Sequence, residues 1–174
     1  MNKTVKRICI DAMMLAILCV IGMFSIPFGE NIKVSLQFLV VIIIFGIIDK
    51  LVDKLLIISS YILLGLFLPI YAGFNSGISP TFGFLIGFFL SIFVYQLFYL
   101  LKIKNANLKY AICCVACLLI TYVSGSIFLS LYLKINYFSS LMVSVVPYIP
   151  FDIFKILLAI FIVNRLSVLQ NKNS

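Results

Sequence analysis

The sequence lacks several of the residues on which enzymes most often depend. It contains no histidine and no tryptophan, and none of its glycines is followed by lysine. Without histidine the chain cannot form the HExxH site of a zinc hydrolase, and without a Gly-Lys pair it has no GxxxxGK[ST] loop to hold the phosphates of ATP. Ser35 and Ser144 form no recognisable dyad motif with Lys155. The sequence therefore predicts a protein that is not an enzyme and that needs no metal and no cofactor.

Charge is also scarce. Only 10 % of the residues are charged, and 5 are acidic. Soluble domains carry about 25 % charged residues. Hydrophobic residues make up 64 % of the chain, and the mean hydropathy is +1.27. This composition predicts one integral membrane domain over residues 1–174, embedded in the lipid bilayer. The formal charge of +8 does not indicate nucleic-acid binding, because the lysines lie at the ends of apolar runs.

The five cysteines all lie within apolar runs, three of them at Cys113, Cys114 and Cys117. Their CCxxC spacing is compatible with a metal or redox site, but no histidine and no second cysteine pair accompanies it. No polar neighbour is placed to stabilise a thiolate. We therefore interpret these residues as buried, inert thiols.

Apolar segments separated by charges and turn residues predict an all-α membrane protein with six transmembrane helices. The second and third segments are shorter than the usual ~20 residues, which suggests a different tilt or flanking re-entrant loops. The six predicted helices are 8–26, 34–48, 55–68, 81–101, 110–133 and 147–166.

The basic residues predict the orientation of the chain. An even number of spans places both termini on one side of the membrane, and ten of the 13 Lys and Arg residues fall on that side. Two lie in the opposite loops, and Lys155 lies within a span. Because positive charge is retained in the cytoplasm, both termini are predicted to be cytoplasmic. The outer loops are then 27–33, 69–80 and 134–146. The ten residues are Lys3, Lys6, Arg7, Lys50, Lys54, Lys102, Lys104, Lys109, Arg165 and Lys172.

The sixth predicted helix carries an acid and a base one turn apart, Asp152 and Lys155, in an otherwise apolar stretch. Residues three apart share a helix face, and a charge at membrane depth costs roughly 2.5–3.5 kcal/mol unless it finds a partner, water or a ligand. The pair therefore predicts a polar ligand site just inside the outer face. A structural role stays open, because Asp152 suits the first helical turn after Pro150 and Lys155 can reach the interface.

Two predicted outer loops are rich in turn residues. Loop 27–36 reads PFGENIKVSL, and loop 69–80 reads PIYAGFNSGISP. Non-helical backbone is not tolerated in lipid, so these loops must be hydrated or folded against protein. With the charge pair nearby, they predict a small-molecule pocket at the outer end of the bundle.

Four blocks of the sequence resemble the BioY family, the biotin-binding S components of energy-coupling factor (ECF) transporters. The most specific resembles the family's glycine-proline-threonine-glycine-glycine-aromatic-leucine block, with Ser79 and Phe82 where glycines are usual. Another resembles its proline-phenylalanine-x-x-aspartate-x-x-lysine block. Together the blocks extend over nearly the whole chain, in the family's order. They are SIPFGENIKVSLQ (25–37), YILLGLFLPIYAG (61–73), SPTFGFLIGF (79–88) and VPYIPFDIFK (146–155).

The resemblance implies an S-component fold of six helices in a bacterial-type cell membrane, with biotin as the captured ligand. Asp152 would accept a hydrogen bond from a ureido N–H. Lys155 would donate to the ureido oxygen or meet the ligand carboxylate, and both assignments stay open. Two alternatives also remain: an S component for a different vitamin, and a small membrane protein with no transport function.

Four further residues complete the predicted binding site. Asn75 and Gln37 carry amides that both donate and accept hydrogen bonds. Tyr61 and Tyr71 would wall the apolar ring of the ligand. For each of the four, loop solvation or packing is the alternative role.

A partner surface is predicted on the first helix, where Ala12 and Ala16 lie four apart on one face. Small residues at this spacing let helices approach closely in lipid. Packing within the bundle would use the same spacing. The resemblance favours docking to a membrane-embedded coupling subunit, which itself sits on two ATPase subunits that power uptake.

Overall fold

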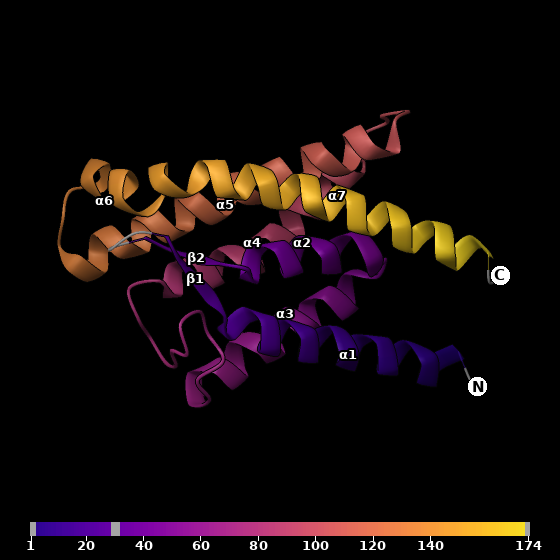
Figure 1. Ribbon diagram of the computed structural model, residues 1–174, viewed down its shortest axis with the longest axis horizontal. Coiled ribbons are helices and arrows are strands. Elements are labelled where there is room, and N and C mark those ends of the chain that lie inside the picture. Colours follow the sequence, from indigo (N-terminus) through magenta and orange to yellow (C-terminus); the bar gives the residue numbers. More distant parts are fainter. Residues whose placement is uncertain (1–2, 29–31, 173–174) are drawn as a thin grey trace.

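Six helices form the body of the protein in residues 3–28 and 32–172, the part of the chain that the computed structural model describes (Figure 1). A seventh, short helix and a two-stranded hairpin lie at the end opposite the two termini (Figure 1). The elements are α1 (Lys3–Met23), β1 (Ser25–Phe28), β2 (Ile32–Ser35), α2 (Gln37–Ile47), α3 (Leu51–Phe67), α4 (Phe82–Tyr99), α5 (Ala106–Leu133), α6 (Tyr137–Ser144), the 3-10 helix η1 (Val146–Tyr148) and α7 (Ile149–Lys172).

All six predicted helices are present, and the main difference lies between the first two. The first helix ends at Met23 rather than at residue 26, and Ser25 and Ile26 pair antiparallel with Ser35 and Val34. Proline disfavours helical geometry in the residue before it, so the chain leaves the helix ahead of Pro27. Residues 34–35, predicted as helix, are therefore strand. Residues 29–31, within a predicted outer loop, lie outside the described residues.

A second difference lies in the predicted outer loop 134–146, where α6 forms. Its N-cap Asn136 accepts a hydrogen bond from the backbone N–H of Phe138 at 3.4 Å. Helix α5 ends just before it at Leu133, and the C-cap residue Lys134 adopts the left-handed conformation with φ 54°. A left-handed residue after a helix stops it and turns the chain back. This turn places α6 against α5, which lets α6 contribute to the outer end of the bundle.

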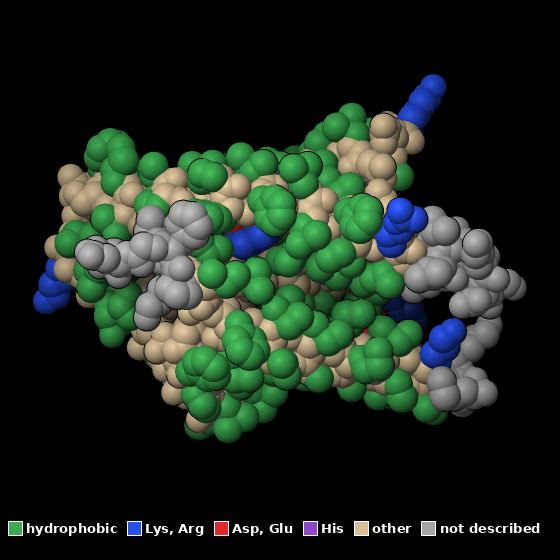
Figure 2. Space-filling model, viewed as in Figure 1, with side chains coloured by type: hydrophobic (Ala, Val, Ile, Leu, Met, Phe, Trp, Pro, Cys, Tyr) green, Lys and Arg blue, Asp and Glu red, His purple; other side chains and the backbone are tan. Residues whose placement is uncertain are grey.

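The surface is predominantly apolar, and the Lys and Arg side chains in view lie mainly toward the end that holds the termini, with others at the opposite end and in the central hollow (Figure 2). Large side chains such as Phe67 (85 % exposed) and Leu131 (73 % exposed) face outward. Three stretches of the described chain, 82–99, 106–133 and 137–166, are long and apolar enough to cross a membrane alone. Outward apolar side chains with charges at the ends are the arrangement that a bilayer requires.

Helices α1 and α3 carry charged side chains that contact one another or a neighbouring ring. Arg7 Nε donates to Asp53 Oδ2 at 2.6 Å, and Arg7 Nη2 donates to Asp53 Oδ1. Lys54, only 2 % exposed, holds its ammonium 4.4 Å from the centroid of the Tyr95 ring. Arg7, Asp53 and Lys54 therefore each have a partner within the bundle, as buried charges require.

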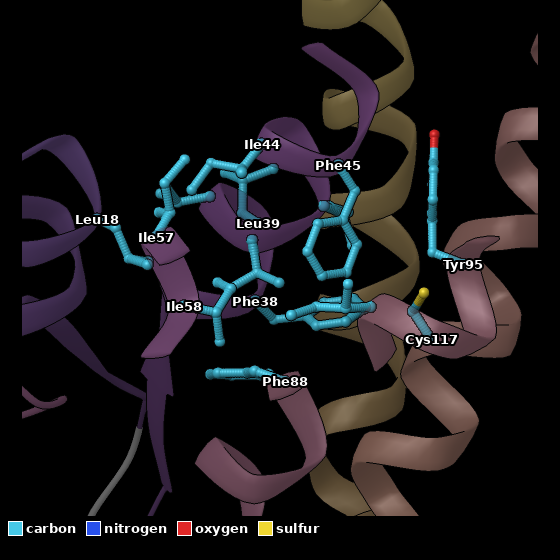
Figure 3. Packing of buried hydrophobic residues seen from close by; sticks show 14 of the residues in the cluster. Leu18, Phe38, Leu39, Ile44, Phe45, Ile57, Ile58, Phe88, Tyr95 and Cys117 are labelled. Carbon is cyan, nitrogen blue, oxygen red and sulfur yellow. The ribbon is translucent and has the colours of Figure 1, made fainter. Parts of the chain in front are cut away.

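Helix α2 lies at the centre of the core. Eight of its eleven residues are buried, on all sides of the helix. A helix that is apolar all round is surrounded by others. Figure 3 shows its Phe38 and Phe45 against Ile58 of α3, Phe88 of α4 and Cys117 of α5. This central position explains how α2, with only 11 residues, is stabilised by burial.

Helices α4 and α5 pack unusually closely through glycines on α4. A Cβ added at Gly87 would lie 2.7 Å from the Cα atom of Thr121, and one at Gly83 would collide with the Phe128 side chain. Gly83 and Gly87 form a GxxxG pattern, which permits such close contact in membranes. This contact fixes the position of α5 at Thr121 and Tyr122.

Loop 69–80 is tied to the ends of two helices. Gly73 N–H donates to the carbonyl of Met23 at the end of α1, and Gly77 N–H donates to the carbonyl of Gly65 in α3, both at 2.9 Å. The two loop glycines have φ angles of +75° and +71°, a region that glycine enters at little cost. The loop is thereby folded against protein, which is one of the two alternatives that its sequence leaves open.

Candidate ligand-binding site

A cavity of about 380 Å³ lies among the hairpin, loop 69–80 and helices α2, α4, α5, α6 and α7. This volume is in the range of roughly 300–1,000 Å³ that is usual for small-molecule sites. Its walls combine apolar side chains, including Phe84, Leu85 and Phe88, with polar groups. The polar and charged lining residues are Ser25, Ser35, Gln37, Tyr71, Asn75, Thr81, Thr121, Tyr122, Ser144, Tyr148, Asp152 and Lys155.

Asp152 and Lys155 form a buried ion pair at this cavity. Lys155 Nζ donates to Asp152 Oδ1 at 2.6 Å, and the two residues are 6 % and 5 % exposed, respectively. Both lie near the start of α7, one turn apart on the face turned to the cavity. Lys155 therefore does not extend to the interface. The predicted pair is present, and its charges cancel within the wall.

A third residue, Tyr122, also binds this ion pair. Tyr122 of α5 donates its hydroxyl hydrogen to Asp152 Oδ2 at 2.5 Å. The carboxylate thus accepts one hydrogen bond on each oxygen, from donors on two different helices. Sequence reasoning missed Tyr122. The signal available was the polar run Thr121-Tyr122 with Ser124 and Ser126 inside an otherwise apolar span.

Gln37 lies at the cavity and is held from two sides. Its Nε2 donates to the hydroxyl of Tyr61 at 2.5 Å, and its Oε1 accepts from Ser35 Oγ at 3.2 Å. Tyr61 in turn donates to the carbonyl of Ile70 at 3.0 Å. Tyr61 is fully buried and is not among the lining residues. Its predicted position in the wall is therefore corrected: it lies behind Gln37 and supports it.

Tyr71 and Asn75 bring loop 69–80 to the cavity. The Tyr71 ring packs edge-on against Tyr61 at 5.7 Å, and its hydroxyl donates to the carbonyl of Ile62 at 2.6 Å. Burial raises the pKa of Tyr71 to about 12, so the phenol keeps the proton that it donates. Asn75 Nδ2 donates to the carbonyl of Ala72 at 2.9 Å, and Asn75 is exposed. The loop thus presents one fixed ring and one accessible amide.

The profile of the BioY family matches residues 1–171 of this sequence. The chain belongs to the BioY family. The Biotin transporter BioY of Thermotoga maritima is 33 % identical over 170 residues, which cover 94 % of this chain and 98 % of that protein. A solved structure, the 2.1 Å crystal structure of the S-component for biotin from an ECF-type ABC transporter, superposes with a TM-score of 0.84 at 25 % identity. That match covers 96 % of this chain and 94 % of the other.

Membership of the BioY family makes the chain a multi-pass membrane component of a transport system, and not an enzyme. The likeness of the whole fold agrees with the six-helix arrangement derived from the sequence. Within the described residues, no group of three or more His, Cys, Asp or Glu side chains is placed to hold a metal ion. The cavity instead offers hydrogen-bond donors and acceptors among apolar walls, as small-molecule binding sites do.

The two alanines of the predicted partner surface lie outside the cavity. Ala12 and Ala16 are both exposed, on the side of α1 that also turns Ile8 and Met13 outward (61 % and 57 % exposed). Packing within this bundle therefore does not use them. In this BioY-family protein the face remains open to lipid or to another membrane protein.

Proposed function

We propose that this chain captures biotin in the cavity and acts as the substrate-binding S component of an ECF-type transporter. Its support is twofold. The BioY family and the biotin S-component structure match nearly the whole chain. The cavity has the size and the mixed polar and apolar lining that a small vitamin requires.

The observation that carries the proposal is the buried Asp152–Lys155 pair in the cavity wall. It places a hydrogen-bond acceptor directly beside a donor. The ureido ring of biotin presents the complementary edge, an N–H beside a C=O. Asp152 would accept from the ureido N–H, while Lys155, which has three donors, would keep its bond to Asp152 and donate to the ureido oxygen.

The rest of the ligand suits the remaining lining. Phe84, Phe88 and the Tyr71 ring offer apolar contact for the thioether ring. Of all the groups of biotin, the ionised carboxylate has the greatest need for hydration or polar partners. We place it near Asn75 and Thr81, which are the exposed polar residues of the lining. In this arrangement Lys155 meets the ureido end.

Capture does not by itself drive uptake, because the sequence contains no phosphate-binding GxxxxGK[ST] loop. We propose that a membrane-embedded coupling subunit and two ATPase subunits supply the energy. The exposed face of α1 around Ala12 and Ala16 supports a docking site for the coupling subunit, since small residues permit close helix contact in lipid.

Retention of labelled biotin by the purified protein tests the proposal. We expect the label to co-elute with the protein in detergent, to be displaced by unlabelled biotin, and to remain bound in excess thiamine or riboflavin. Displacement by thiamine or riboflavin at concentrations where biotin fails would assign the chain to a different vitamin.

A further inference from the structure

Asp152 is held by hydrogen bonds from two different helices. Lys155, on the same helix, donates to Oδ1 at 2.6 Å, and Tyr122, on α5, donates to Oδ2 at 2.5 Å. A carboxylate oxygen can accept more than one hydrogen bond. Each oxygen therefore keeps capacity for one further donor after its internal partner is counted. The residue is 5 % exposed and lines the cavity, so a ligand is the donor that can reach it.

The two donors constrain the carboxylate differently. Lys155 is a long, flexible side chain one turn away on α7, and it moves with that helix. Tyr122 has a rigid ring with only two rotatable bonds, and it approaches from a second helix. A donor of this kind fixes the side-chain torsions of Asp152 and not merely its charge.

Tyr122 itself stands on a well-braced part of α5. Its carbonyl accepts from Ser126 Oγ at 2.7 Å, and the carbonyl of Ser126 accepts from Ser140 Oγ of α6 at 2.7 Å. Gly87 of α4 also allows a close approach to the backbone of Thr121, the preceding residue. The hydroxyl of Tyr122 is thus presented from backbone that neighbouring helices hold in place.

We propose that Tyr122 is a positioning residue for ligand recognition, acting through Asp152. Its hydroxyl holds the carboxylate in the orientation that receives an N–H donor of a ureido ligand. It also keeps Asp152 anchored while Lys155 shares its remaining donors with the ligand oxygen. Pre-orientation of this kind raises affinity by removing the cost of ordering the side chain on binding. The inference rests on the proposed capture of biotin at this site.

A double-mutant cycle tests it. The variants are Tyr122→Phe, Asp152→Asn and the two combined, and the measurement is the dissociation constant for biotin in detergent. Tyr122→Phe removes one oxygen atom and should weaken binding about 10-fold, the lower end of what a hydrogen bond to a charged group contributes. In the Asp152→Asn background, where the carboxylate is gone, the same change should alter the constant less than about 2-fold, because coupled residues are non-additive.

Tyr137→Phe is the matched control. Like Tyr122→Phe, this change removes a tyrosine hydroxyl. The Tyr137 hydroxyl lies 3.4 Å from Oγ of Ser126, the serine that donates to the Tyr122 carbonyl, but Tyr137 does not line the cavity. Its affinity should stay within about 2-fold of the native protein, since exposed, remote groups contribute little. Desthiobiotin, which retains the ureido ring and lacks the thioether, should lose the same factor as biotin on Tyr122→Phe.

Several results would overturn the inference. An unchanged constant for Tyr122→Phe, or an equal loss in the native and Asp152→Asn backgrounds, would show that Tyr122 does not act through Asp152. A loss for biotin that spares desthiobiotin would place its action at the thioether. If Asp152→Asn leaves biotin binding intact, the proposed site itself fails, and the positioning role fails with it.

Discussion

Asp152 and Lys155 show how two charges are accommodated at the depth of a membrane without loss of recognition chemistry. The pair is neutral as a unit, and the contact between the two charges offsets part of the cost of removing each from water. Tyr122 adds a second hydrogen bond to the carboxylate. The cavity wall therefore carries strong hydrogen-bonding groups but no net charge, which suits a neutral ring with adjacent donor and acceptor atoms.

Replacing either member of the pair should affect ligand binding more than folding. We expect Asp152→Asn and Lys155→Ala each to weaken biotin binding about 10- to 150-fold, since a hydrogen bond to a charged group contributes on the order of 1.5–3 kcal/mol. Equilibrium dialysis measures the affinity and a thermal melt measures the stability. Native affinity in both variants, together with a lowered melting temperature, would mean that the pair is only a structural ion pair.

At this scale the sequence predicted the residues whose partners are near in the chain. Asp152 and Lys155 are one turn apart, so their contact follows from helix geometry. Tyr122 lies 30 positions from Asp152, and no local pattern indicates that their helices adjoin. Tyr61 was expected in the cavity wall, against the apolar ring of the ligand, yet its hydroxyl is used by Gln37 and Ile70. Which side of a helix faces a cavity depends on tertiary packing.

Among the elements, α4 and α5 together form one wall of the cavity. Gly87 lets α4 approach the backbone of Thr121, and the neighbouring Phe88 and Tyr122 then face the same cavity. Backbone cannot yield as a flexible side chain can. A side chain at position 87 must therefore move one of the two helices, and with it the wall.

We expect Gly87→Val to lower the melting temperature and to weaken biotin binding. Overpacking a close contact typically costs about 1–3 kcal/mol. Leu90→Val is the matched control, because it places the same β-branched residue on the same helix at a position that is 39 % exposed. A melting temperature for Gly87→Val equal to that of Leu90→Val would contradict the account of this helix contact.

The sequence predicted the helices that follow from long apolar runs. It did not predict the elements whose formation depends on turn residues. Helices α4 and α5 follow from long apolar runs. The hairpin of β1 and β2 was expected as the end of one helix, a loop and the start of the next. Its formation depends on Pro27 ending the helix and on pairing between Ser25 and Ser35, a contact that hydrophobic periodicity does not report. Helix α6, with only eight residues, was likewise within a predicted loop.

The whole molecule separates its two proposed tasks in space. The cavity lies at the end that holds the hairpin and α6, whereas the small-residue face of α1 lies on the outside of the bundle. The termini share the opposite end (Figure 1). With the excess of basic residues on the terminal side, the positive-inside rule predicts that the cavity faces the exterior, from which a nutrient arrives.

Bulky residues on α1 should therefore disrupt assembly and leave capture intact. We expect Ala12→Trp combined with Ala16→Trp to abolish co-purification with the proposed coupling subunit and biotin uptake, because the large rings prevent close helix contact. Leu119→Trp is the control, since Leu119 is 59 % exposed on α5 and should support both. Loss of biotin binding along with assembly would show that the alanines contribute to the fold instead.

Calorimetric titration of the purified protein without ATP tests the central claim most directly. Capture uses contacts that the cavity already provides, so biotin should bind saturably at one site per chain, while thiamine and riboflavin should give no saturable heat. Saturable binding of thiamine or riboflavin in the absence of biotin binding would contradict the account.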